Sequence, residues 1–366
     1  MGGVSVTIDI TGVPPERIAF SPSPLAELGN AVHVLAEPGH HPAHHAWATA
    51  TNAALEPGLA DRLLEADFMW RSTRSDFLLP ARPRETLAEE LDDLDRIDDE
   101  TFVGSALEIS CSPRYARGGI PSPLVDEGSR RRALDLAAAR GPRQAAFAER
   151  MISAPTATRA WLRRLLEDCD QAFFADTWRR VRVQLAADAR HKTELMRRKG
   201  LADALADASR ALCLEEDHEG TRIVVDKLVE ARTEARAGAL TLVPSAFGRP
   251  HLIALYTPGW QPVIMYPAAS REVGGLESVG TVGLRLEALA HPVRMRMCRS
   301  LARGPYSTSE LADTHGITAP EVSRHLAVLR KAGLLTTRRR GRYVLHQLDF
   351  SVVARLGSDF LESVLR

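Results

Sequence analysis

The chain has 366 residues, 45% of them hydrophobic and 26% charged, so we expect two or three domains with packed cores and exclude a globally disordered protein. No apolar run approaches the roughly 20 residues that a membrane-spanning helix needs, and residues 1–12 lack the basic and apolar regions of a signal peptide, so we expect no membrane partner. The four cysteines form no Cys-x-x-Cys pair, which favours a reduced, cytoplasmic protein.

Charge is divided unevenly along the chain. Lys+Arg and Asp+Glu both number 47, yet residues 281–366 contain 14 basic and 7 acidic side chains, which leaves the first three-quarters acidic. A basic block beside a larger acidic one predicts a nucleic-acid-binding module attached to a body that avoids nucleic acid.

The first 220 residues have mostly helical patterns. After a strand of alternating apolar residues at Val4–Ile10, we expect helices at Pro24–Leu35, with Ser23 as the N-cap, and at Pro57–Phe68. The carboxylate-rich stretch Thr86–Glu100 has apolar residues at helical spacing, which predicts a helix with a solvated acidic face.

The pattern then changes from helix to strand. From Pro155 to Leu185 apolar residues recur at three- and four-residue steps, which predicts one long helix with a buried stripe. Strand-like segments follow at Thr221–Leu228, Leu240–Phe247, His251–Tyr256 and Gln261–Tyr266. We therefore expect an α+β, predominantly helical fold, in which a large helical domain with a small antiparallel sheet spans residues 1–275. Ser270–Gly280 is then a hinge, and residues 281–366 form a second domain.

The second domain begins with the pattern of a helix-turn-helix. Ser307 and Glu310 form a capping box for a helix at Ser309–His315, which Gly316 ends. A further helix from Thr318 has an apolar inward stripe and a small, polar outward face that fits a major groove about 12 Å wide. The candidate DNA contacts of this region are Ser307, Thr318, Pro320, Glu321, Ser323, Arg324, His325 and Lys331.

A basic hairpin follows the two helices. Two strand-like arms, Leu334–Arg338 and Tyr343–Leu348, flank a tip in which Gly341 suits a turn with positive φ. Such a wing places arginines along a phosphate backbone or in a minor groove. The candidate DNA contacts here are Arg338, Arg339, Arg340, Arg342 and Tyr343.

These motifs resemble the ArsR/SmtB family of bacterial winged-helix regulators. The resemblance covers about the last 85 residues and rests on residues 289–294 (L-A-H-P-V-R), 309–312 (S-E-L-A), 322–334 (V-S-R-H-L-A-V-L-R-K-A-G-L) and the R-G-R-Y of the wing. It implies a homodimer that binds a double-stranded DNA operator and responds to an effector. The dimer would pair through the first and last helices of the domain, here Leu284–Leu289 and Phe350–Leu365.

The resemblance also bears on metal sensing. Metal-sensing members carry Cys-x-Cys where this chain has Ser307 and Ser309, and histidines on the last helix where it has Ser351 and Glu362. Serine hydroxyls do not replace thiolates as ligands of soft metals. We therefore expect no cofactor and a non-metal, small organic effector that binds the N-terminal domain. That domain contains V-L-A-E-P-G-H-H-P-A-H-H-A-W at 34–47, L-V-P-S-A-F at 242–247 and P-G-W-Q-P-V-I-M-Y-P at 258–267. With these segments it resembles the large N-terminal region of some actinobacterial ArsR-like regulators, a likeness that names no ligand.

A histidine run leaves an alternative open. His40, His41, His44 and His45 form two i, i+4 pairs, the spacing that places two imidazoles on one helix face. Pro42 most simply begins a helix and leaves the first two outside it, and no acidic or cysteine ligand lies in the run. We expect packing and capping histidines, with a metal site as the alternative.

The preferred function is a cytoplasmic, dimeric transcriptional repressor. We do not expect an enzyme, because the sequence contains no nucleophile elbow, P-loop or dinucleotide fingerprint. One alternative is an enzyme or ligand-binding protein with the winged helix as an appendage, which a buried N-terminal pocket with convergent titratable groups would favour. Another is a winged helix that binds protein, with its arginine tip neutralised by an acidic partner, for example the Thr86–Glu100 segment of the same chain. The sequence does not identify pocket residues among the five tryptophans.

Overall fold

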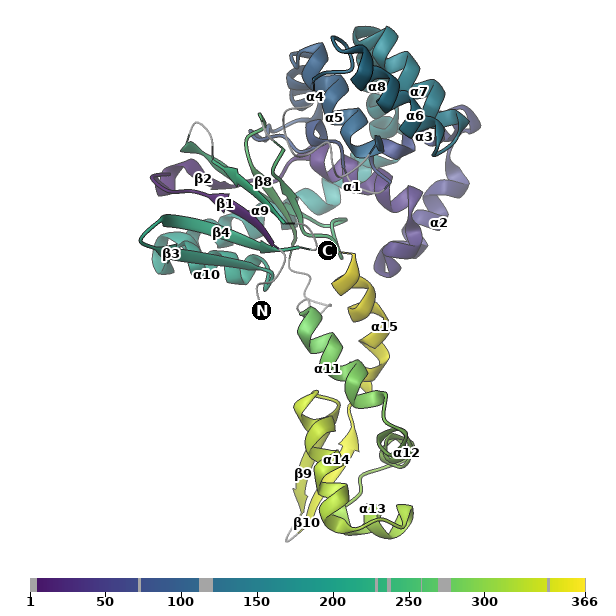
Figure 1. The fold of residues 1–366 in the computed structure, drawn as a ribbon, viewed down its shortest axis with the longest axis vertical. Helices are drawn as coiled ribbons and strands as arrows, with labels where there is room; N and C mark the ends of the chain where they lie inside the picture. Colours follow the sequence, from purple (N-terminus) through teal and green to yellow (C-terminus); the bar gives the residue numbers. More distant parts are fainter. Residues whose placement is uncertain are drawn as a thin grey trace. The chain divides into compact units, whose positions relative to one another are not determined.

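The computed structural model describes residues 5–71, 74–111, 121–227, 230–235, 238–257, 259–268, 278–340 and 343–365 (Figure 1). The chain divides into two compact units, Met1–Gly274 and Gly275–Leu365. Most of the predicted hinge, residues 270–277, lies outside the described residues. None of the described helices is long and apolar enough to cross a membrane.

Unit 1 combines a helical layer with two sheets. Its helices are α1 (Pro24–Ala36), α2 (His45–Ala54), α3 (Pro57–Ala66), α4 (Leu87–Asp95), α5 (Asp99–Cys111), α6 (Glu127–Ala138), α7 (Pro142–Ser153), α8 (Pro155–Cys169), α9 (Ala175–Lys199) and α10 (Leu201–Ala208). Helix α1 begins as predicted, because Ser23 Oγ accepts a hydrogen bond from the Ala26 N–H at 3.0 Å. Buried aromatic residues such as Trp70, Phe102 and Phe147 fill the core between the helices.

The sheets of unit 1 are mixed, which corrects the prediction of one small antiparallel sheet. Its strands are β1 (Ser5–Asp9), β2 (Ile18–Phe20), β3 (Leu212–Asp217), β4 (Gly220–Asp226), β5 (Ala231–Glu234), β6 (Leu240–Ser245), β7 (Ile253–Leu255) and β8 (Val263–Pro267). One sheet has the order β3-β4-β1-β5 and the other β2-β6-β8-β7. The pairs β1/β5, β2/β6 and β6/β8 are parallel, while the predicted hairpin β7/β8 is antiparallel. The short strands β2 and β5 escaped prediction because three or four residues carry too little periodicity.

The predicted long helix is interrupted. Helices α8 and α9 are joined by a π-helical turn at Asp170–Phe174, which inserts an extra residue into the helical repeat. The buried stripe therefore continues through Phe174, while Phe173 is only partly buried. The two tryptophans of this stretch, Trp161 and Trp178, are partly buried and pack against the core.

The acidic stretch is less solvated than predicted. Its Glu90 is 1% exposed and accepts hydrogen bonds from the Ser23 hydroxyl (2.9 Å), the Leu25 N–H (2.6 Å) and the Arg84 N–H (2.9 Å). Burial raises the pKa of Glu90 to about 7, against the opposing effect of these hydrogen bonds. This carboxyl therefore ties the beginning of α4 to the beginning of α1.

Unit 2 is a winged helix-turn-helix. Its elements are α11 (Val279–Leu289), α12 (Pro292–Leu301), α13 (Thr308–His315), α14 (Ala319–Lys331), β9 (Leu335–Arg340), β10 (Tyr343–Leu348) and α15 (Phe350–Val364). Buried residues from all the helices except α15, together with Leu348 of β10, form one core, against which Val352 and Val353 of α15 pack. The α+β, predominantly helical class is thereby confirmed for the chain.

Candidate nucleic-acid interface

The turn between α13 and α14 is fixed by local interactions. The capping box forms as predicted, since the Glu310 N–H donates to Ser307 Oγ at 3.3 Å and the Ser307 N–H donates to Glu310 Oε2 at 2.7 Å. The hydrogen bond that the Ser307 N–H donates also lowers the pKa of the Glu310 carboxyl. Gly316 ends α13 with a φ of 64°, a left-handed conformation that favours glycine.

Helix α14 has the two faces that its sequence predicts. Val322, Leu326 and Leu329 are buried in the core of the unit. The exposed residues of the helix and its N-cap are Thr318, Ala319, Pro320, Ser323, Arg324, Ala327, Val328, Arg330 and Lys331. Thr318 occupies the N-cap position without a capping hydrogen bond from its side chain, and Pro320 lies in the first turn, where its missing N–H breaks no helical hydrogen bond. A helix surface of mostly small and polar residues, with three cationic side chains and the apolar Val328, is therefore open to solvent.

Three of the predicted contacts are less accessible. Ser307 is 8% exposed and its hydroxyl serves as the cap of α13, so the structure gives it a role in folding. His325 is partly buried, with its ring centroid 5.0 Å from that of His291. Burial, aided by the neighbouring His291 and Arg294, lowers the pKa of His325. Glu321 is partly buried as well.

The wing is an antiparallel hairpin. Its register pairs Tyr343 with Arg340, Val344 with Arg339 and Leu345 with Arg338. Arg338 and Arg339 are exposed, and because side chains alternate along a strand they point to opposite faces of the hairpin. Gly341 and Arg342 lie outside the described residues, as do the side chains of Arg340 and Tyr343.

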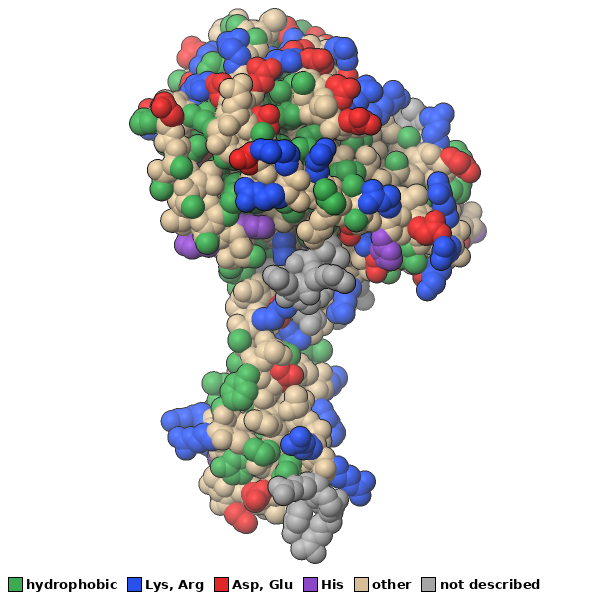
Figure 2. Space-filling view, turned by 180° about the vertical axis from the view of Figure 1, so that it is seen from behind, with side chains coloured by type: hydrophobic (Ala, Val, Ile, Leu, Met, Phe, Trp, Pro, Cys, Tyr) green, Lys and Arg blue, Asp and Glu red, His purple; other side chains and the backbone are tan. Residues whose placement is uncertain are grey.

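The surface of unit 2 carries many Lys and Arg side chains and few Asp and Glu side chains on the face that Figure 2 shows. This agrees with the excess of basic over acidic residues in 281–366. A helix face of small residues beside a basic hairpin combines the two parts of a major-groove reader, one for base edges and one for phosphates.

Helices α11 and α15 pack against each other through a buried ion pair. Arg285 Nη1 lies 2.8 Å from Asp359 Oδ2, and the two residues are 5% and 2% exposed. Large apolar side chains on these same helices are nevertheless exposed by more than 40%: Val279, Leu284, Leu286, Phe350, Phe360 and Val364. Apolar exposure of this kind is typical of a surface that is covered in an assembly.

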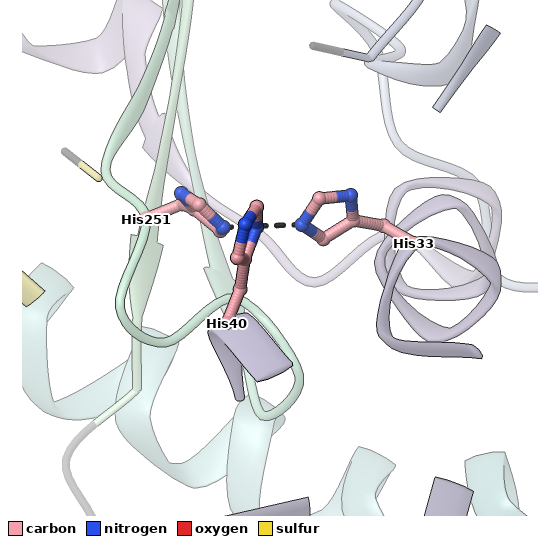
Figure 3. Close-up of side chains that lie close together, drawn as sticks. All are labelled: His33, His40 and His251. Carbon is pink, nitrogen blue, oxygen red and sulfur yellow. Dashed lines mark hydrogen bonds between the residues drawn. The ribbon is translucent and has the colours of Figure 1, made fainter. Parts of the chain in front are cut away.

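The histidine run does not form the i, i+4 pairs that its spacing allows. His45 is exposed at the beginning of α2, and His44 donates from Nε2 to the Ala246 carbonyl at 3.1 Å while its ring stacks on Phe247. His40 instead lies beside His33 and His251, which are distant in sequence (Figure 3). Sequence reasoning missed these two residues, because single histidines in a helix and a loop carry no local signal.

Two family comparisons cover most of the chain. Residues 4–272 match the family of unknown function DUF5937, and residues 289–338 match a helix-turn-helix domain family. The first match spans more than half of the chain, and the second spans α12, α13, α14 and most of β9.

Three curated relatives each match about a fifth of the chain. The chain is 39% identical over 75 residues to the biofilm growth-associated repressor of Agrobacterium fabrum, a stretch that covers 20% of this chain and 64% of the relative. It is 39% identical over 72 residues to the transcriptional repressor SmtB of Mycobacterium tuberculosis, covering 20% of this chain and 53% of that protein. The regulator NmtR of the same organism is 35% identical over 80 residues, covering 22% and 67% respectively.

A solved structure, that of the transcriptional repressor BigR from Xylella fastidiosa, is 31% identical to this chain, with a TM-score of 0.19, 24% coverage of this chain and 83% of that one. The chain spans less than two thirds of the length of several of its curated relatives. Since residues 4–272 match its family model, the chain belongs to the family of unknown function DUF5937, and since residues 289–338 match a helix-turn-helix model and the relatives are repressors of one type, it carries a C-terminal helix-turn-helix domain of the ArsR/SmtB family.

Proposed function

We propose that this protein is a sequence-specific DNA-binding transcriptional repressor. The observation that carries the proposal is the exposed face of α14, on which Ser323 and Arg324 stand between the small residues of the first turn and Lys331. In this arrangement α14 enters the major groove, where hydroxyl and guanidinium groups donate to base edges. The exposed Arg338 and Arg339 of the wing contact the phosphate backbone.

The protein acts as a homodimer that pairs through α11 and α15. The exposed apolar residues of these two helices, among them Leu284 and Phe360, support this pairing, since a second copy would remove them from water. A two-fold dimer reads two half-sites about one helical turn of DNA apart, so the operator is an inverted repeat.

Unit 1 senses a small organic effector. A surface pocket of about 600 Å³ lies along α9, with Phe20 and Ala189 as apolar lining and Arg190, Glu194 and Arg197 as polar lining. This volume lies in the range of small-molecule sites. Ser307 and Ser309 of unit 2 stand where metal-sensing family members have thiolate ligands. Serine hydroxyls do not bind soft metals in their place, which supports an effector other than a metal ion.

The acidic stretch is a poorer partner for the wing than its composition suggests, because arginines of its own unit already pair with four of its carboxylates. The ion pairs are Asp93–Arg84 at 2.7 Å, Asp92–Arg163 at 2.8 Å, Asp95–Arg163 at 2.5 Å and Asp99–Arg159 at 3.0 Å. This favours DNA over an acidic segment of the same chain as the target of the arginine tip.

Genomic footprinting of the purified full-length protein tests the proposal. We expect a small set of enriched inverted-repeat sites. In Arg324→Ala, the binding free energy that separates these sites from random duplex should fall by about 1–3 kcal/mol. Arg198→Ala is the matched control, because it removes an exposed arginine from α9 of unit 1. Uniform coverage of the genome by the wild type, or unchanged preference in Arg324→Ala, would exclude this assignment of the reading helix.

A further inference from the structure

Three histidines of unit 1 converge on one point. His33 lies in α1, His40 ends the short 3₁₀ turn Pro38–His40, and His251 lies in the loop between β6 and β7. One ring nitrogen from each lies within 4.8 Å of the others (Figure 3). His33 and His251 are 0% and 8% exposed, while His40 is partly exposed and gives the cluster a route to solvent.

The hydrogen bonds of the rings determine which nitrogens hold lone pairs. His33 Nδ1 lies 2.6 Å from the Trp70 carbonyl, and since a carbonyl only accepts, Nδ1 is the protonated nitrogen. His33 Nε2 therefore presents a lone pair toward His251 Nε2, 3.1 Å away. An imidazole whose far N–H donates to a backbone carbonyl is oriented in the way that metal-binding histidines are.

A neighbouring ring repeats this arrangement. His41 Nδ1 donates to the Arg249 carbonyl, and the His41 ring lies 4.9 Å from that of His33 and 5.2 Å from that of His251. His41 Nε2 and His40 Nδ1 are buried and have no hydrogen-bonding partner among the described residues. A hydrogen bond between His33 and His251 satisfies those two rings only, so it leaves unexplained the buried Nδ1 of His40, the third ring of the cluster.

We propose that His33, His40 and His251 bind a divalent transition metal ion, preferably zinc, with an open fourth position. Imidazole nitrogens suit zinc, which binds them at about 2.0–2.1 Å in tetrahedral geometry. Two such ligands are about 3.3 Å apart, close to the 3.1 Å between the Nε2 atoms of His33 and His251. His40 sits on a three-residue turn, which can adjust to complete the set.

The charge of the surroundings specifies the fourth ligand. Arg74 is buried, and its Nε donates to Asn30 Oδ1 at 3.1 Å, while Nη2 has no hydrogen-bonding partner among the described residues. Three neutral imidazoles leave the metal charge uncompensated beside this guanidinium, so an anion, either hydroxide or a carboxylate, takes the open position. The site is independent of unit 2 and goes beyond the proposed DNA binding.

Metal titration of the full-length, untagged protein tests the site after removal of metal with EDTA. We expect one equivalent of Zn²⁺ to bind per chain, and Co²⁺ to give the visible absorption of a tetrahedral nitrogen site. His40→Ala is the informative variant, because His40 is partly exposed and its loss leaves the core intact. We expect its affinity to fall roughly 100-fold or more.

His45→Ala is the matched control, since it removes an exposed histidine of the same run and should bind like the wild type. His251→Gln, with its fold checked by circular dichroism, extends the test to a buried ligand. Less than one equivalent bound to the wild type, or wild-type affinity in His40→Ala, would overturn the proposal. DNA binding by His40→Ala is measured in parallel, so a failed metal site is distinguished from a failed DNA-binding assignment.

Discussion

The buried ion pair between α11 and α15 offers the sharpest test of unit 2. Arg285→Ala leaves the Asp359 carboxylate buried, with Arg355 at 3.5 Å as its remaining ion pair. Removing one partner of a buried pair costs about 3–5 kcal/mol, because a desolvated charge loses its compensation. Replacing both partners by apolar residues, as in Arg285→Met with Asp359→Leu, removes that charge and is expected to be nearly neutral.

Hydrogen–deuterium exchange of the full-length protein measures this effect locally. At about 1.4 kcal/mol per tenfold change, Arg285→Ala should raise the exchange rates of α11 and α15 peptides by roughly 10² to 4 × 10³-fold, with peptides of unit 1 unchanged. The double variant should exchange at rates close to wild type. Wild-type exchange in Arg285→Ala, or a double variant as unstable as the single one, would show that the pair does not hold these helices together.

Three further predictions concern stability. Leu326→Ala removes a side chain that is 4% exposed in the core of unit 2. In denaturant titrations it should lower the free energy of unfolding of that unit by about 2–5 kcal/mol. Leu64→Ala is the control with a mild effect, because Leu64 is exposed on α3. Ser307→Ala should cost about 1 kcal/mol through loss of the α13 cap, and Ser307→Asn, which restores a capping group, should recover most of it; equal losses in both variants would refute the capping role. The raised pKa of Glu90, about 7, favours the neutral form in the folded state, so the stability that this group contributes is present below about pH 4.5 and is lost as the pH rises toward 7. Unfolding free energies between pH 4.5 and 7 should therefore fall by up to about 1.4 kcal/mol per pH unit from this group, and the slope should flatten in Glu90→Gln; identical slopes would contradict the shift.

Unit 2 was predictable because its signals are local. The capping box spans four residues, Gly316 marks the turn, and the inward stripe of α14 lies within eight residues. Each of these features acts through neighbours in sequence, so the residue pattern alone predicts the conformation. The exposure of Ser323, Arg324 and Lys331 follows from the same helical period.

Unit 1 was less predictable because its decisive contacts are long-range. His33 and His251 are 218 residues apart, and Glu90 reaches Ser23 across 67 residues. The parallel pairing of β1 with β5 likewise joins opposite ends of the unit. Local periodicity indicates none of these contacts. The burial of Glu90 and the proximity of His33 and His251 therefore follow only from the three-dimensional structure.

The salt dependence of DNA binding tests the central claim most directly. Binding of full-length protein to duplex DNA should weaken with salt, with a slope of log K against log salt near −0.9 per phosphate contact. The double variant Arg338→Ala/Arg339→Ala removes two exposed wing arginines from each protomer, so a dimer should show a slope shallower by about 3–4. A wild-type slope in this variant, or no duplex binding by the wild-type protein at low salt, would contradict the account.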